Sequence, residues 1–134
     1  MKTGYLIHVS GKRKSSIAIA TLRQGKGVVR INHVNLDVLN QSTPKMKIME
    51  PLLLAGNIAS NVNIEVNVKG GGYMSQAEAS RLVIARALAQ HDKKLEKVFL
   101  EYDRHLLVAD IRRKETKKPN RHGKARAKTQ KSYR

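Results

Sequence analysis

The sequence contains no cysteine and no tryptophan, and it has only one phenylalanine among its 134 residues. Without cysteine the chain can form no disulfide bond, no thiolate metal site and no thiol nucleophile, which agrees with a reducing compartment. Long apolar runs are missing too. The longest uncharged stretch, residues 51–64, contains three asparagines and is shorter than the roughly twenty apolar residues of a membrane-spanning helix. The first residues lack the apolar segment of a secretory signal, so we expect neither a signal peptide nor a membrane span.

Acidic residues are also few, and they are scarcest near the C-terminus. The chain has 27 Lys and Arg against 10 Asp and Glu, a net charge of +17. Residues 111–134 hold 11 of these basic residues and one acid, Glu115, so this segment contributes +10 and residues 1–110 contribute the remaining +7. Its only large apolar side chains are Ile111 and Tyr133, which cannot offset an ordering cost of about 1–2 kcal/mol per residue. We therefore expect residues 111–134 to form an extended basic arm that lies on an acidic partner.

Charge concentrated at one end of a chain points to a polyanion, which could be nucleic acid, an anionic membrane or an acidic protein. A membrane is the weakest candidate, because the arm lacks the large apolar face of an interfacial helix and contains Pro119 and Gly123, which disfavour a long helix. Small residues such as Ala125 and Ala127 separate the basic ones and let the backbone approach a polyphosphate. The arm therefore favours nucleic acid.

Length and hydrophobic patterning predict that residues 1–110 form one domain, in which helices pack against a β-sheet. Alternating apolar residues, many of them β-branched, predict four strands, at residues 6–9, 17–22, 28–31 and 62–69. Helical spacing predicts three helices, over residues 45–56, 76–90 and 93–102, and a last packed segment at residues 106–109.

Local features refine the expected helices. Pro51 predicts a kink or a break in the first helix, and Gly56 is placed as its C-terminal stop. Ser75 and Glu78 have the spacing of a capping box, which would start the second helix. Arg81, on that second helix, is expected to face solvent or a ligand, as is Arg86.

Two loops are informative. The glycine-bearing loop 24–27 predicts that the second and third strands pair as an antiparallel hairpin. The loop between the first two strands, residues 10–15, contains three adjacent cations, Lys12, Arg13 and Lys14. These cations predict a second basic patch on the surface, separate from the arm.

No motif in the sequence predicts catalysis, a cofactor or a metal. The five histidines are dispersed without ligand spacing, and Asp103, His105 and Asp110 have no nucleophile beside them, so a local ion pair between Asp103 and Arg104 is the simpler expectation. The triple glycine 70–72 precedes a helix but lacks the Lys-Ser or Lys-Thr of a phosphate loop. It predicts either a flexible strand-to-helix turn or close packing of that turn on an RNA backbone.

Several short segments occur in an order that is typical of one family. They are Ser10-Gly11-Lys12-Arg13-Lys14, Lys69-Gly70-Gly71-Gly72 with Gln76-Ala77, Tyr102-Asp103-Arg104 with residues 106–110, Arg112-Arg113 with Glu115 and Lys117-Lys118, Ala125-Arg126-Ala127, and the ending Gln130-Lys131-Ser132-Tyr133-Arg134. On these segments the chain resembles the universal ninth family of small-subunit ribosomal proteins, in its archaeal and eukaryotic form. One departure is residues 118–123, where many eukaryotic relatives have a glycine-rich insertion without Pro119. It concerns the path of the arm at this point and not its endpoint.

The resemblance implies a two-layer α/β fold like the second domain of ribosomal protein S5, in which a four-stranded mixed sheet is covered by helices and contains a left-handed βαβ crossover. It also implies a cytoplasmic location in the head of the small ribosomal subunit. The implied partners are ribosomal RNA, the peptidyl-site tRNA and neighbouring head proteins, with no membrane and no small-molecule substrate. The expected contacts with ribosomal RNA are Lys12, Arg13, Lys14, Lys69, Gly70, Gly71, Gly72, Arg112, Arg113, Lys114, Lys117, Lys118, Arg121, Lys124, Arg126 and Lys128. The expected contacts with tRNA are Lys131, Ser132, Tyr133 and Arg134.

Two other interpretations remain open at this point. A free-standing nucleic-acid-binding protein or RNA chaperone would have the same composition, but it would bind any duplex about equally well. An enzyme on the same fold would need a carboxylate cluster for metal or a complete phosphate loop, and the sequence contains neither.

Overall fold

The computed structural model describes residues 5–126 and 132–133 and shows a two-layer α/β fold. One sheet contains five strands, in the spatial order β1 (Leu6–Arg13), β2 (Ser16–Gln24), β5 (Val62–Lys69), β3 (Val29–Ile31) and β4 (Val34–Asn35). The α-helices are α1 (Ser42–Ala55), α2 (Tyr73–His91) and α3 (Lys94–Tyr102), and short 3₁₀ helices cover η1 (Leu36–Val38), η2 (Gly56–Asn61) and η3 (Arg104–Leu106).

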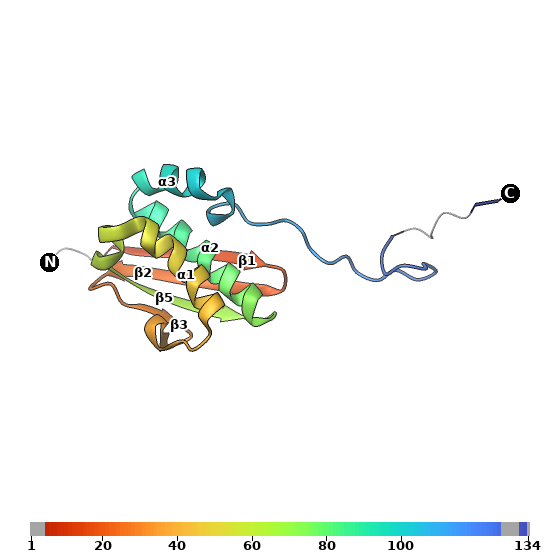
Figure 1. Ribbon diagram of the computed structural model, residues 1–134, viewed down its shortest axis with the longest axis horizontal. Coiled ribbons are helices and arrows are strands. Elements are labelled where there is room, and N and C mark those ends of the chain that lie inside the picture. The colour runs from red at the N-terminus through yellow and green to blue at the C-terminus, as the bar shows by residue number, and fades with distance from the viewer. Residues whose placement is uncertain (1–4, 127–131, 134) are drawn as a thin grey trace.

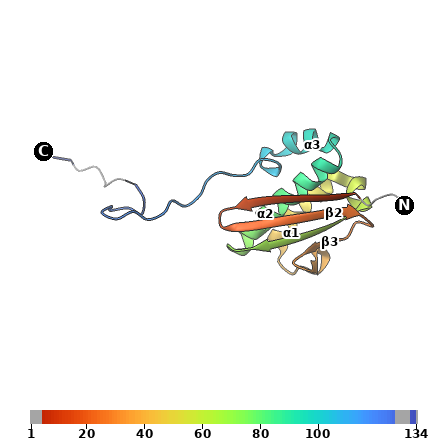
Figure 2. The same cartoon turned by 180° about the vertical axis from the view of Figure 1, so that it is seen from behind.

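The helices lie on one side of the sheet (Figure 1), and the other face is open in the view from behind (Figure 2). The two-layer prediction is confirmed, with one strand more than expected. The additional strand, β4, has only two residues and is too short to show an alternating pattern. In the described part of the chain no helix has the length and apolar character needed to cross a membrane.

Strand β5 lies at the centre of the sheet and shows the predicted alternation. Val62, Ile64, Val66 and Val68 are buried. Glu65, Asn67 and Lys69 alternate with them and face the open side. Helix α2 packs between this sheet and the other two helices, which explains why it is apolar around most of its circumference.

The predicted hairpin between the second and third strands is wrong, because β5 lies between them. Strand β2 pairs antiparallel with β5, and β3 pairs parallel with the opposite edge of β5. The glycine-bearing loop bonds instead to the chain where it enters β5: Gly25 N–H donates to O of Asn61, the residue before the strand (3.0 Å), and Gly27 N–H donates to O of Val62, its first residue (3.1 Å). Strand β3, helix α1 and β5 thus form a βαβ crossover, whose left hand remains a prediction.

Helix α1 is a single helix, so the predicted break at Pro51 does not occur. Pro51 is fully buried, so its apolar ring is part of the core. Gly56 ends the helix as expected: its φ is +56°, and its N–H donates to Leu52 O.

The predicted capping box is also wrong. Helix α2 begins at Tyr73 with Gly72 as its N-cap, and no side chain caps it. Ser75 is therefore already inside the first turn, and Glu78 is used elsewhere, by Arg13 of β1.

The triple-glycine turn packs tightly on the turn between β1 and β2. Gly70 and Gly71 have φ of +79° and +68°, in the left-handed region that favours glycine. A Cβ on Gly71 would overlap with Ser16 Oγ. The Ser16 hydroxyl is buried and donates to Gly70 O (2.7 Å). These contacts support the interpretation of a strand-to-helix turn.

This packing predicts a difference between two adjacent glycines. Gly71→Ala should lower the free energy of unfolding by about 2–4 kcal/mol, because the backbone is left-handed and Ser16 would have to move. Gly72→Ala is the matched control, since a Cβ there meets nothing within 4 Å. It should cost at most about 1 kcal/mol. Urea unfolding of both variants tests this, and equal losses would contradict it.

Candidate nucleic-acid interface

The turn between β1 and β2 is shorter than the sequence predicts. Strand β1 continues to Arg13, which pairs with Ser16, so the turn consists only of Lys14 and Ser15. Because neighbouring side chains on a strand point to opposite faces, Lys12 shares the open face with Ile17, whereas Arg13 and Ser16 share the helix-covered face. Lys14, at the tip, has a φ of +52° and is exposed.

Arg13 is largely buried and forms ion pairs with two different elements. Its Nε lies 2.7 Å from Oε2 of Glu78 on α2, and its Nη2 lies 3.6 Å from Oδ2 of Asp110, where the arm begins. The third nitrogen, Nη1, is buried and has no hydrogen-bond partner within residues 5–126 and 132–133. A buried guanidinium requires such carboxylates, because an unpaired buried charge is costly. Arg13 therefore fixes the start of the arm to the body.

Arg86 of α2 makes a second connection between the body and the root of the arm. Its Nε donates to Leu107 O (2.9 Å), and its Nη1 donates to Ser10 O on β1 (3.0 Å). Leu106, just before this point, is completely buried. The start of the arm is thus held by packing and by two arginines, Arg13 and Arg86.

The expectation that Arg81 and Arg86 contact solvent or a ligand is therefore wrong. Arg81 also bonds within the protein, through Nε to Oε2 of Glu50 (2.7 Å) and through Nη2 to Oδ2 of Asp103 (3.0 Å). Asp103 consequently pairs with Arg81 and not with Arg104. Although burial raises the pKa of Asp103, the hydrogen bonds from His105 N–H and Arg81 outweigh it and lower that pKa overall.

Asp110 orients the first basic residue of the arm. It accepts hydrogen bonds from the backbone N–H of Arg112 (2.9 Å) and from Arg112 Nη2 (2.7 Å). These bonds, led by the one from the Arg112 side chain, hold the pKa of Asp110 far below its usual range, and the nearby charge of Arg13 adds to the effect.

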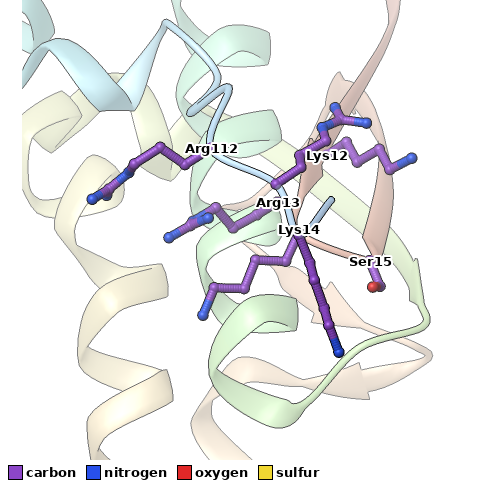
Figure 3. A pocket seen from close by; sticks show the side chains of 7 residues that line it. Lys12, Arg13, Lys14, Ser15 and Arg112 are labelled. Carbon is purple, nitrogen blue, oxygen red and sulfur yellow. The ribbon is translucent and has the colours of Figure 1, made fainter. Parts of the chain in front are cut away.

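The turn and the arm together enclose a basic cleft of about 850 Å³. Its lining comes from two segments about a hundred positions apart in the sequence. Lys12 and Arg13 at the end of β1 and Lys14 and Ser15 of the turn form one side, and Arg112, Arg113 and Lys114 of the arm form the other. Figure 3 shows Arg112 beside the turn residues. Among the described residues that line this cleft, none is a carboxylate. Six cationic side chains around one open cavity produce the positive potential that attracts a polyanion.

The other predicted contacts are distributed along the arm and at one end of the sheet. Lys69 on β5 pairs with Ile17 on β2, which in turn pairs with Lys12 of the cleft. The triple-glycine turn packs on Ser15 and Ser16, so it also lies near the basic cleft. The exposed arm residues are Lys117, Lys118, Arg121, Lys124 and Arg126, together with Ser132 and Tyr133 near the end. Lys128, Lys131 and Arg134 lie outside the described residues. Within the described ranges, no group of three His, Asp or Glu side chains could hold a metal ion.

Sequence reasoning missed the two carboxylates that organise the cleft. The Asp110-x-Arg112 spacing could have indicated Asp110, because an aspartate often accepts the N–H two residues later. Nothing local marks Glu78, which meets Arg13 across 65 positions of sequence.

Comparison with known proteins identifies relatives of the whole chain. Residues 11–134 match the family model described as ribosomal protein S9/S16. The chain is 46% identical over 132 residues to "Small ribosomal subunit protein uS9" of Methanococcus maripaludis strain C7, which covers 96% of this chain and 98% of that protein. It is 52% identical over 127 residues to the protein of the same name from Desulfurococcus amylolyticus, covering 93% of this chain and 90% of that protein.

The lowered pKa of Asp110 predicts a pH dependence of stability. A carboxyl whose folded pKa is below its unfolded value of about 3.9 stabilises the fold above that pH and loses this contribution as the pH falls. Asp110→Asn should therefore lower the urea midpoint at pH 7, and its difference from the wild type should shrink toward pH 3. Asp37→Asn is the control, because Asp37 forms no ion pair within the described ranges. A constant difference between wild type and Asp110→Asn would argue against this role.

Proposed function

Since the chain belongs to the ribosomal protein S9/S16 family, we propose that its basic cleft and arm bind the ribosomal RNA of the small subunit. As a member of this family the protein is a structural constituent of the small ribosomal subunit in the cytoplasm, and it is not an enzyme. Family membership favours this function over a free-standing nucleic-acid-binding protein or RNA chaperone.

The observation that carries the proposal is the convergence of six cations from two distant segments on one cleft, among whose described lining residues there is no carboxylate. Two of the six, Arg13 and Arg112, also pair with Glu78 or Asp110, and the other four, which form no ion pair within the described part of the chain, are free for phosphate. Each phosphate that these cations neutralise releases counterions, so binding would be strong at low salt and would weaken steeply as salt rises. Arginine can bind a phosphate with two parallel hydrogen bonds, whereas lysine acts as a point charge. Because Arg13 is engaged with Glu78 and Asp110, the exposed cations around it are the better candidates for phosphate contacts.

We further propose that Lys131, Ser132, Tyr133 and Arg134 contact the peptidyl-site tRNA. The arm runs away from the body after α3 (Figure 1), which supports a partner distinct from the one at the cleft. Tyr133 is 89% exposed, so its ring is free to stack on a base or a ribose.

Exposed cations of the cleft should set the salt dependence of RNA binding. Replacing Lys14, Arg113 and Lys114 by Gln should reduce the slope of log affinity against log salt by about 2–3, at roughly 0.7–0.9 per lost phosphate contact. The control replaces three exposed lysines outside the cleft, Lys93, Lys94 and Lys97, and removes the same charge. Titration of small-subunit RNA with both variants tests this, and equal slopes would contradict the assignment of the cleft.

Deletion of residues 131–134 separates the two RNA partners. It should weaken binding of tRNA to the peptidyl site while the truncated protein still enters the subunit. Filter binding of tRNA to subunits carrying the truncated protein measures the first effect. Deletion of all of residues 111–134 should in addition impair incorporation into the subunit. Unchanged tRNA affinity after the short deletion would reject the proposed role of the tip.

A further inference from the structure

The arm contains a closed loop between Lys118 and Lys124. The backbone N–H of Lys118 donates to Lys124 O at 2.8 Å, and the loop turns at Pro119 and Asn120. Proline presets the backbone for the first central position of such a turn. Asn120 has a φ of +59°, a conformation that asparagine tolerates better than most residues. The loop is therefore encoded locally, by the residues at its turn.

One ion pair joins the two segments that flank this loop. Oε1 of Glu115 lies 2.6 Å from Nη2 of Arg126, so these residues meet outside the bond between Lys118 and Lys124. Glu115 is the only acid between residue 111 and the C-terminus, where 11 basic residues surround it in the sequence. If this segment only attracted a polyanion, the negative charge of Glu115 would weaken binding. The ion pair with Arg126 indicates that Glu115 has a structural role.

The closed loop borders a second basic cavity, of about 710 Å³, next to the turn between β1 and β2. Lys114, Lys117, Arg121 and Lys124 line it, together with Ser15 of that turn. Glu115 also lines it, and the charge of Glu115 is balanced by Arg126. The cavity thus remains positively charged although it contains a carboxylate.

We propose that Glu115 is a positioning residue, which folds residues 115–126 into a preformed loop that binds the phosphate backbone of RNA. This inference rests on the proposed function, in which the arm lies on ribosomal RNA. Holding Lys117, Arg121 and Lys124 around one cavity lowers the entropy that the arm loses on binding. Arg126 then serves the loop by pairing with Glu115, and the other cations contact the phosphates.

The proposal makes a prediction of unexpected sign. Glu115→Gln raises the net charge from +17 to +18, and counterion release alone would leave RNA affinity equal or higher. If Glu115 holds the loop, the same substitution should weaken binding about two- to fivefold, because a smaller fraction of the arm is in the binding conformation. Asp37→Asn adds the same charge outside the arm and should leave affinity equal or slightly higher.

The charge swap Glu115→Arg with Arg126→Glu completes the test. It keeps the net charge at +17 and can restore the pair, so it should recover most of the lost affinity, whereas Arg126→Glu alone should not. All variants are measured as full chains against small-subunit ribosomal RNA by fluorescence anisotropy at one fixed salt concentration. Because the chain has no cysteine, spin labels at Thr116→Cys and Ala125→Cys also report loop closure, and their distance distribution should broaden in Glu115→Gln.

The outcomes distinguish this inference from the function on which it depends. A wild-type chain that binds generic duplex DNA as tightly as ribosomal RNA would reject the proposed function. A wild-type chain that prefers ribosomal RNA, together with Glu115→Gln binding as tightly as Asp37→Asn, would reject only the role of Glu115. Failure of the charge swap to recover affinity would reject it as well.

Discussion

The guanidinium of Arg13 connects three parts of the molecule that are distant in sequence. It belongs to β1, it pairs with Glu78 of α2, and it reaches Asp110 where the arm leaves the body. A largely buried guanidinium requires carboxylate partners such as these, because an unpaired buried charge is costly. The direction in which the arm leaves the body therefore depends on the packing of the sheet on α2. The basic cleft depends on this connection, because half of its cations belong to β1 and the following turn and half belong to the arm.

Hydrophobic patterns within single segments predicted the strands and helices that depend on local sequence. The strict alternation of β5 and the apolar circumference of α2 follow directly from which residues are buried. The hairpin prediction failed because a glycine-bearing loop shows that the chain can turn, but not which strand it will meet. Here the loop next to Gly25 bonds to the start of β5, which comes almost forty residues later.

The charged residues also fall into those that the local sequence predicts and those whose role depends on distant partners. The arm could be predicted from composition alone, since so many cations cannot be buried. The roles of Arg81 and Arg86 could not, because their partners Glu50, Asp103 and Leu107 O lie on other elements. The spacing of Ser75 and Glu78 predicts a helix cap, whereas the carboxylate of Glu78 forms a long-range ion pair with Arg13. A local motif can thus be overridden by a tertiary contact, here with a largely buried arginine.

The closed loop of the arm also limits how far its tip can lie from the body. A fully extended chain spans about 3.3 Å per residue, so the 24 residues of the arm could cover about 80 Å. The segment from Lys118 to Lys124 could span about 20 Å if it were extended. The hydrogen bond between these two residues brings its ends together. Because the two bonded residues still lie about 5 Å apart, the reach of the arm is about a fifth less than its residue count allows. Its length is a property of the folded loop, and a sequence change that opened or closed that loop would move the tip without altering any residue at the tip.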